Sequence, residues 1–144
     1  MAVERYETRV TEDVLVFEFV SIGPKGEILK RVIYQHVEDD LYNLAFGDAT
    51  SDGFINDEIV TNNNDTSKVL ATVAMTIFDF FTAHEGTIVL AKGSTHSRTR
   101  LYRRYLTQFL TQINQDFVLF SELYGEIKRF QKNMDYPSFS ITKK

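Results

Sequence analysis

The sequence predicts a single α+β domain in which a curved, mainly antiparallel sheet carries two main helices, in the order ββββ-α-β-α-βββ. Three observations predict this class: runs rich in β-branched and aromatic residues, two segments with apolar residues at helical spacing, and turn residues between them. The chain has 144 residues, so residues 1–144 are expected to form one domain. An apolar content of 43% is sufficient for a hydrophobic core without disulfides or a structural metal.

The first part of the chain is expected to form an antiparallel meander. Its sequence alternates between runs rich in Val, Ile, Phe and Tyr and short clusters of turn residues. The segment GPKG, at residues 23–26, has the composition of a four-residue hairpin loop between two such runs. The expected strands are residues 6–10, 14–22, 27–37 and 41–47.

A polar segment and a helix are expected next. Residues 48–66 are dense in Asp, Asn, Gly, Ser and Thr, which favour turns, and a short strand is expected near residues 54–60. The following apolar residues recur at three-to-four spacing, which predicts an amphipathic helix. Asp65 or Thr66 can cap its first turn, and Gly86 can end it.

A strand, a second helix and a terminal group of strands complete the expected order. Residues 87–91, TIVLA, form a short apolar run, which favours a strand buried on both faces or in the centre of the sheet. A second helix is expected from about Ser97 to Asn114, because its apolar residues fall on one broad face. A hairpin is expected over residues 117–130 and a last strand over residues 138–142.

Composition excludes several classes of protein. No apolar run approaches the roughly 18 residues of a membrane span, and the N-terminus lacks a signal-peptide pattern, so we expect a cytoplasmic protein without membrane contact. The absence of cysteine excludes disulfides, thiolate zinc sites and cysteine nucleophiles. The histidines lie in separate expected elements. The acidic loop, which we define as the acidic residues of segment 48–66, lacks the EF-hand spacing, so no metal site and no cofactor are expected.

Charge is distributed unevenly along the chain. The net charge is −4, which argues against a globally basic nucleic-acid binder. The window from Gly86 to Gln115, however, contains five Lys or Arg and no Asp or Glu, so it carries +5 and the remainder −9. Such asymmetry can direct an anionic partner to one face of a protein.

The positive charge concentrates at the expected start of the second helix, in STHSRTRLYRRYL, Ser94–Leu106. The start of a helix is the positive end of its dipole, so arginines there are favourable when an anion binds between them and the backbone N–H groups. Hydroxyls add donors, and guanidinium groups can grip phosphate oxygens in pairs. The spacing is neither a Walker loop nor GxGxxG. The candidate ligand-binding residues are Lys68, Ser94, Thr95, Arg98, Arg100 and Arg103.

A structural alternative stays open for the same residues. Ser94 or Thr95 would then only cap the helix, and internal carboxylates would neutralise the arginines. The carboxylates available for this belong to Asp48, Asp52, Asp57 and Glu58.

Three segments resemble those of an uncharacterised bacterial family of unknown function. They are LYNLAFGD at residues 41–48, NNNDTSKVLATV at residues 62–73 and GSTHSRTRLYRR at residues 93–104. The last segment, of the GSTxxRTRLYRR type, is the most specific, and the resemblance covers nearly the full chain. It implies a single-domain architecture and brings no established activity. Asn64 stands where glycine is more frequent in similar chains.

Three functions stay open at this stage. The leading one is a non-enzymatic module that binds nucleic acid or a phosphorylated small molecule through the basic turn at residues 93–104. A second is a phosphodiesterase or ribonuclease-like enzyme in which His96 or Asp57 acts as the acid or base and the arginines stabilise phosphorane charge. A third is a protein-interaction module or homodimer that uses a sheet edge or an aromatic surface.

Overall fold

A computed structural model describes residues 4–56, 61–91, 100, 103–104, 117–123, 126–129 and 139–143. The chain divides into two compact units, which are described separately below. The first unit consists of Met1–Tyr34 and Ala45–Glu85, and the second of Gln35–Leu44 and Gly86–Lys144. That residues 1–144 form one domain stays a prediction.

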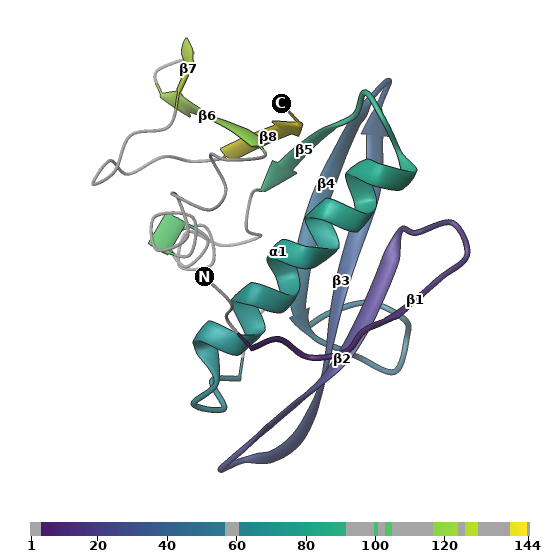
Figure 1. The fold of residues 1–144 in the computed structure, drawn as a ribbon, viewed down its shortest axis with the longest axis vertical. Coiled ribbons are helices and arrows are strands. Elements are labelled where there is room, and N and C mark those ends of the chain that lie inside the picture. The colour runs from purple at the N-terminus through teal and green to yellow at the C-terminus, as the bar shows by residue number, and fades with distance from the viewer. Residues whose placement is uncertain are drawn as a thin grey trace. The chain divides into compact units, whose positions relative to one another are not determined.

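The first unit is built on a long β-hairpin. Strand β2 (Val16–Gly23) pairs antiparallel with β3 (Gly26–Glu38), from Val16 opposite Ile33 to Gly23 opposite Gly26. The short strand β1 (Arg9–Val10) pairs antiparallel with β2 on its other side (Figure 1). The predicted four-residue loop is therefore a tighter turn, because the two strands continue to Gly23 and Gly26.

Helix α1 (Thr66–Ala83) packs on the face of the hairpin that carries its aromatic residues. The ring of Tyr34 on β3 stacks on Phe80 with 4.2 Å between centroids, and its hydroxyl is 2.9 Å from the Thr76 hydroxyl. The apolar spacing predicted this buried face of the helix. The fully or nearly fully buried residues of α1 are Val69, Leu70, Thr72, Thr76, Ile77, Phe80 and Phe81.

Strand β4 (Leu41–Asp48) follows β3, and α1 connects it to β5 (Ile88–Ala91). In the second unit, Leu41 lies opposite Ile88 in a parallel pair. Strand β8 (Phe139–Lys143) pairs antiparallel with β5 and with β6 (Phe117–Leu123), and β6 also pairs with β7 (Glu126–Arg129). The hydrogen-bonded order is β1-β2-β3-β4-β5-β8-β6-β7.

The predicted fold class is wrong in its helices, its sheet and its element order. Two helices against a mainly antiparallel sheet were expected, whereas the described residues define one helix, α1, and a mixed sheet with a parallel β4–β5 pair. Apolar spacing indicates that a segment is a strand but not its direction. Two neighbouring parallel strands need a long crossover connection, which is usually a helix. Helix α1 is this connection between β4 and β5.

Some expected elements lie partly outside the described residues. Of the expected second helix, residues 97–114, Arg100, Arg103 and Arg104 are described, and these have helical backbone conformation. In the expected strand near residues 54–60, Ile55 forms an isolated bridge with Ala49, and residues 57–60 are outside the described part.

Within the described residues, no helix combines the length and apolar character that crossing a bilayer requires.

Candidate functional site

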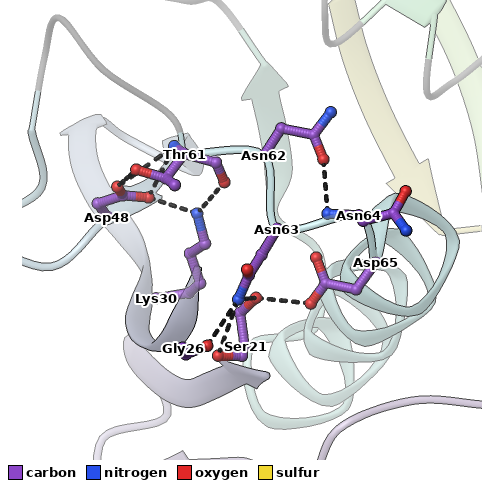
Figure 2. Close-up of polar contacts among 9 residues, drawn as sticks. All are labelled: Ser21, Gly26, Lys30, Asp48, Thr61, Asn62, Asn63, Asn64 and Asp65. Carbon is purple, nitrogen blue, oxygen red and sulfur yellow. Dashed lines mark hydrogen bonds and ion pairs between the residues drawn. The ribbon is translucent and has the colours of Figure 1, made fainter. Parts of the chain in front are cut away.

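A polar cluster lies in the first unit where the chain enters α1 (Figure 2). We define the polar cluster as Ser21, Lys30, Asp48, Thr61, Asn63 and Asp65, together with the hydrogen bonds between them. It joins the hairpin and the end of β4 to the segment that leads into the helix. The sequence predicted roles for Asp48 and Asp65 and none for the other four members.

Lys30 and Asp48 form a buried ion pair in the polar cluster. The Lys30 side chain is 1% exposed, and its ammonium donates to the Asp48 carboxylate and, at 2.8 Å, to the Thr61 carbonyl. The Asp48 carboxylate also accepts hydrogen bonds from the Thr61 hydroxyl and N–H. Burial alone would raise the pKa of the Asp48 carboxyl, but the bonds from Lys30 and Thr61 outweigh it and hold this pKa below its usual value. Both charges are thus satisfied internally.

Asn63 holds the turn of the hairpin. Its side chain is buried; the amide nitrogen donates to the Gly26 carbonyl at 2.8 Å, and the amide oxygen accepts the Lys25 N–H at 2.8 Å. The backbone of Asn63 lies so close to the end of β2 that only glycine fits at position 23. A Cβ at Gly23 would lie 2.0 Å from the backbone carbonyl oxygen of Asn63. Asn64, the next residue, has a φ of 60°, in the left-handed region that glycine and asparagine adopt most readily.

Asp65, one of the two residues expected to cap α1, occupies the N-cap position, but its side chain does not cap the first turn. Its carboxylate accepts hydrogen bonds of 2.6 Å from both the Tyr6 hydroxyl and the Ser21 hydroxyl instead. The ammonium of Lys68, in the first turn, lies 4.3 Å from the centroid of the Tyr6 ring, a cation–π contact. Lys68 therefore has a defined place at the start of the helix, where the first turn contains no acidic residue.

The predicted site residues are distributed over both units and the undescribed segments. Lys68 is half-buried in the first unit, while Arg100, exposed, and Arg103, half-buried, belong to the second. Neighbouring Arg104 is exposed. The other candidates, which are Ser94, Thr95, His96, Arg98 and Asp57, lie outside the described residues.

The acidic loop offers a test of the structural alternative for the arginines. Asp48 is bound to Lys30 and Thr61, as described above. Asp52 accepts hydrogen bonds from the Thr50 hydroxyl and the Phe54 N–H, which lower the pKa of its carboxyl. These two carboxylates thus have local partners, and Asp57 and Glu58 are outside the described part of the chain.

The two described histidines have structural contacts. One nitrogen of His36 lies 2.8 Å from the Asp39 carbonyl, and one of His84 lies 2.8 Å from the Asp13 carbonyl. Across the described ranges, no group of three His, Cys, Asp or Glu side chains is placed to hold a metal ion.

Sequence reasoning missed Lys30, Asn63 and Tyr6. A signal existed for Lys30, because it occupies an inward position of β3, alternating with Val32 and Tyr34. A lysine in such a place needs a buried acid. No comparable signal marked Asn63 in a run of three asparagines.

Comparison with family models identifies one match. The model of DUF6934, described as a family of unknown function, matches residues 2–144. Comparisons with curated proteins and with solved structures find no match.

Proposed function

We propose that this chain, which belongs to the DUF6934 family of unknown function, is an anion-binding module for nucleic acid or a phosphorylated small molecule. The observation that carries the proposal is the acid-free basic window, which contains exposed arginines. Between Gly86 and Gln115 the chain has five Lys or Arg and no acidic residue. Arg100 and Arg104 are exposed, and no described residue forms an ion pair with either.

The spacing of these two arginines suits a phosphate-bearing ligand. Residues four apart on a helix lie on the same side, about 6 Å apart along the axis. Each guanidinium can bind two phosphate oxygens, so one ligand with two phosphates can engage both side chains. Arg98, Ser94 and Thr95, nearer the expected helix start, would supply further donors to the same ligand.

The occupied carboxylates of the acidic loop also support the proposal. Asp48 and Asp52 are hydrogen-bonded to Lys30 and Thr50, respectively, so both carboxylates already have local partners. Lys68 is a second candidate cation, at a helix start whose Asp65 carboxylate is bound to Tyr6 and Ser21 rather than to the first turn.

Fluorescence anisotropy with labelled oligonucleotides tests the nucleic-acid version, and calorimetry with tripolyphosphate tests the small-molecule version. We expect binding to weaken as the salt concentration rises. The arginine side chains displace counterions from the phosphates when they bind, and a higher salt concentration opposes this release. The double variant Arg100→Ala/Arg104→Ala should weaken binding and flatten the salt dependence. Its matched control is Arg5→Ala/Arg129→Ala, which removes two exposed arginines elsewhere. Absence of affinity for every probe at low salt would overturn the proposal.

A further inference from the structure

Strand β4 is followed by a small hairpin, residues 49–55, which we call the tip hairpin. It is closed by an antiparallel bridge between Ala49 and Ile55. Its outermost residues include Asp52 and Gly53, which are both exposed. Among all Asp and Asn residues of the chain, Asp52 alone is followed by glycine. Backbone attack on a side-chain carboxyl group is least hindered at such a pair, because glycine has no Cβ.

The Asp52–Gly53 pair can rearrange with water as the only other reactant. The Gly53 nitrogen attacks Cγ of Asp52, so a C–N bond forms and a C–O bond of the carboxyl group breaks. The carboxyl hydroxyl and the amide proton leave as one water, and a succinimide ring remains. Uptake of one water at the side-chain carbonyl carbon restores aspartate. Uptake at the main-chain carbonyl carbon gives isoaspartate, in which the backbone runs through Cγ and is longer by one methylene group.

The Gly53 side of this reaction meets little resistance. The φ of Gly53 is 90°, and among the described residues no atom beyond its chain neighbours lies within 4 Å of the position that a Cβ would take. The Gly53 N–H donates to the Thr50 carbonyl at 3.3 Å, which is longer than the usual range of about 2.7–3.2 Å. The amide nitrogen is therefore held weakly and has room to approach the carboxyl group.

The Asp52 side of the reaction is restrained. Its carboxylate accepts hydrogen bonds from the Thr50 hydroxyl and, at 3.1 Å, from the Phe54 N–H. These bonds, together with the nearby charge of Arg31, hold the pKa of the Asp52 carboxyl below its usual value. The protonated carboxyl is the form that reacts, because its hydroxyl leaves as water. A low pKa and a fixed carboxylate therefore both slow the attack.

Arg31 ties the tip hairpin to β3. Its guanidinium donates to the Thr50 carbonyl at 2.9 Å and to the Phe54 carbonyl at 2.6 Å. Its Nε also donates to the Glu18 carboxylate at 2.8 Å, which fixes the guanidinium. Because the two carbonyls lie on either side of Asp52, Arg31 limits the backbone rotation that the attack requires.

We propose that Asp52 is a modification site, at which attack by Gly53 forms isoaspartate, and that Thr50 and Arg31 set the rate of this conversion. The extra methylene group lengthens the turn between the Thr50 and Phe54 carbonyls, which breaks the double contact of Arg31. The conversion is therefore a lasting change in the loop after β4.

Peptide mapping of the full chain, aged at mildly acidic pH, measures the conversion, with an isoaspartate-specific methyltransferase as the probe. We expect isoaspartate at position 52 in the wild type, formed more slowly than in a free peptide of residues 48–56. Thr50→Val removes the hydroxyl donor and should raise the rate about threefold to tenfold, as for the loss of one hydrogen bond. Arg31→Met should raise the rate at least about tenfold, because two charged hydrogen bonds to the tip hairpin are lost.

Two control variants separate this chemistry from general loosening of the fold. Arg9 also faces Glu18, at 3.9 Å, but among the described residues no hydrogen bond or ion pair joins it to the tip hairpin, so Arg9→Met should keep the wild-type rate. Gly53→Asn should stop the conversion at Asp52, because asparagine adopts positive φ readily while its Cβ hinders the attack.

The absence of isoaspartate at position 52 in the wild type and in both faster variants would overturn the site. A wild-type rate equal to that of the peptide, or unchanged rates in Thr50→Val and Arg31→Met, would overturn its control by these contacts. Thr50→Val keeps the test valid if Arg31→Met fails to fold, since it leaves the Arg31 side chain in place. The anion-binding test is independent, because Arg100 and Arg104 are unchanged in these variants.

Discussion

Replacing Lys30 by methionine should destabilise the protein more than any exposed charge substitution. Methionine has a similar length and is apolar, so the buried volume of Lys30 is retained and the charge is lost. The Asp48 carboxylate, 17% exposed, would keep its bonds from Thr61 but lose its cation, and the Thr61 carbonyl would lose a donor. Removing one partner of a buried ion pair costs about 3–5 kcal/mol. Because Thr61 still donates hydrogen bonds to Asp48, we expect a loss at the lower end of this range, about 3 kcal/mol.

Urea unfolding measures this loss as a change in the free energy of unfolding. The midpoint should fall for Lys30→Met while the slope m stays constant. The double variant Lys30→Met/Asp48→Asn removes the unpaired charge and should recover at least about 1 kcal/mol, since the asparagine oxygen can still accept from Thr61. An exposed control is Lys25→Met, which should change the free energy by less than about 0.5 kcal/mol. A loss below about 1 kcal/mol for Lys30→Met, or no recovery in the double variant, would refute the reasoning.

Three further predictions concern the polar cluster and the residues beside it. The carboxyl pKa of Asp48 is lower in the folded state than in the unfolded chain, so its stabilisation is present above the unfolded pKa, about 4, and is lost as pH falls through the lower folded pKa; the difference in unfolding free energy between wild type and Asp48→Asn should therefore stay constant at neutral pH and narrow as pH falls below about 4, and a constant difference down into this acid range would contradict the ion pair. Gly23→Ala should lower the melting temperature and increase exchange of the Lys25 amide, because the new Cβ displaces Asn63; an unchanged melting temperature would contradict the close approach. Asn64→Gly should change the free energy of unfolding by less than about 1 kcal/mol, whereas Asn64→Val should lower it by about 1–2 kcal/mol, since a branched residue resists positive φ; equal effects in chemical denaturation would argue against the left-handed conformation.

Local patterns predicted local structure well. The strands β2, β3 and β4, the helix α1 and the strand β5 lie close to the expected ranges, because alternation and three-to-four spacing report directly on which residues are buried. The positive φ of Asn64 suits the glycine that the resemblance implies for this position. By contrast, the parallel pairing of β4 with β5 depends on how distant segments meet, which the spacing of apolar residues does not specify.

The candidate site was predictable only in its chemistry. Clustered arginines and the absence of acids are visible in the sequence, and so is the glycine-rich character of the hairpin turn. The partners of the acidic residues are not, because Asp48 meets Lys30 through pairing of strands and Asp65 meets Tyr6 across 59 positions of sequence. The predicted side-chain cap at Asp65 is absent for the same reason. Asp65 occupies the N-cap position, but its carboxylate accepts a hydrogen bond from Ser21 instead of from the first turn of the helix.

The most direct measurement of the proposed function is an NMR titration with tripolyphosphate that follows the Nε–Hε signals of the arginines. Anion binding by the basic segment predicts saturable shifts for Arg100 and Arg104, lost in Arg100→Ala/Arg104→Ala and weakened by salt. Signals that stay fixed up to high ligand concentration, or shifts confined to arginines of the first unit such as Arg5 and Arg9, would contradict it.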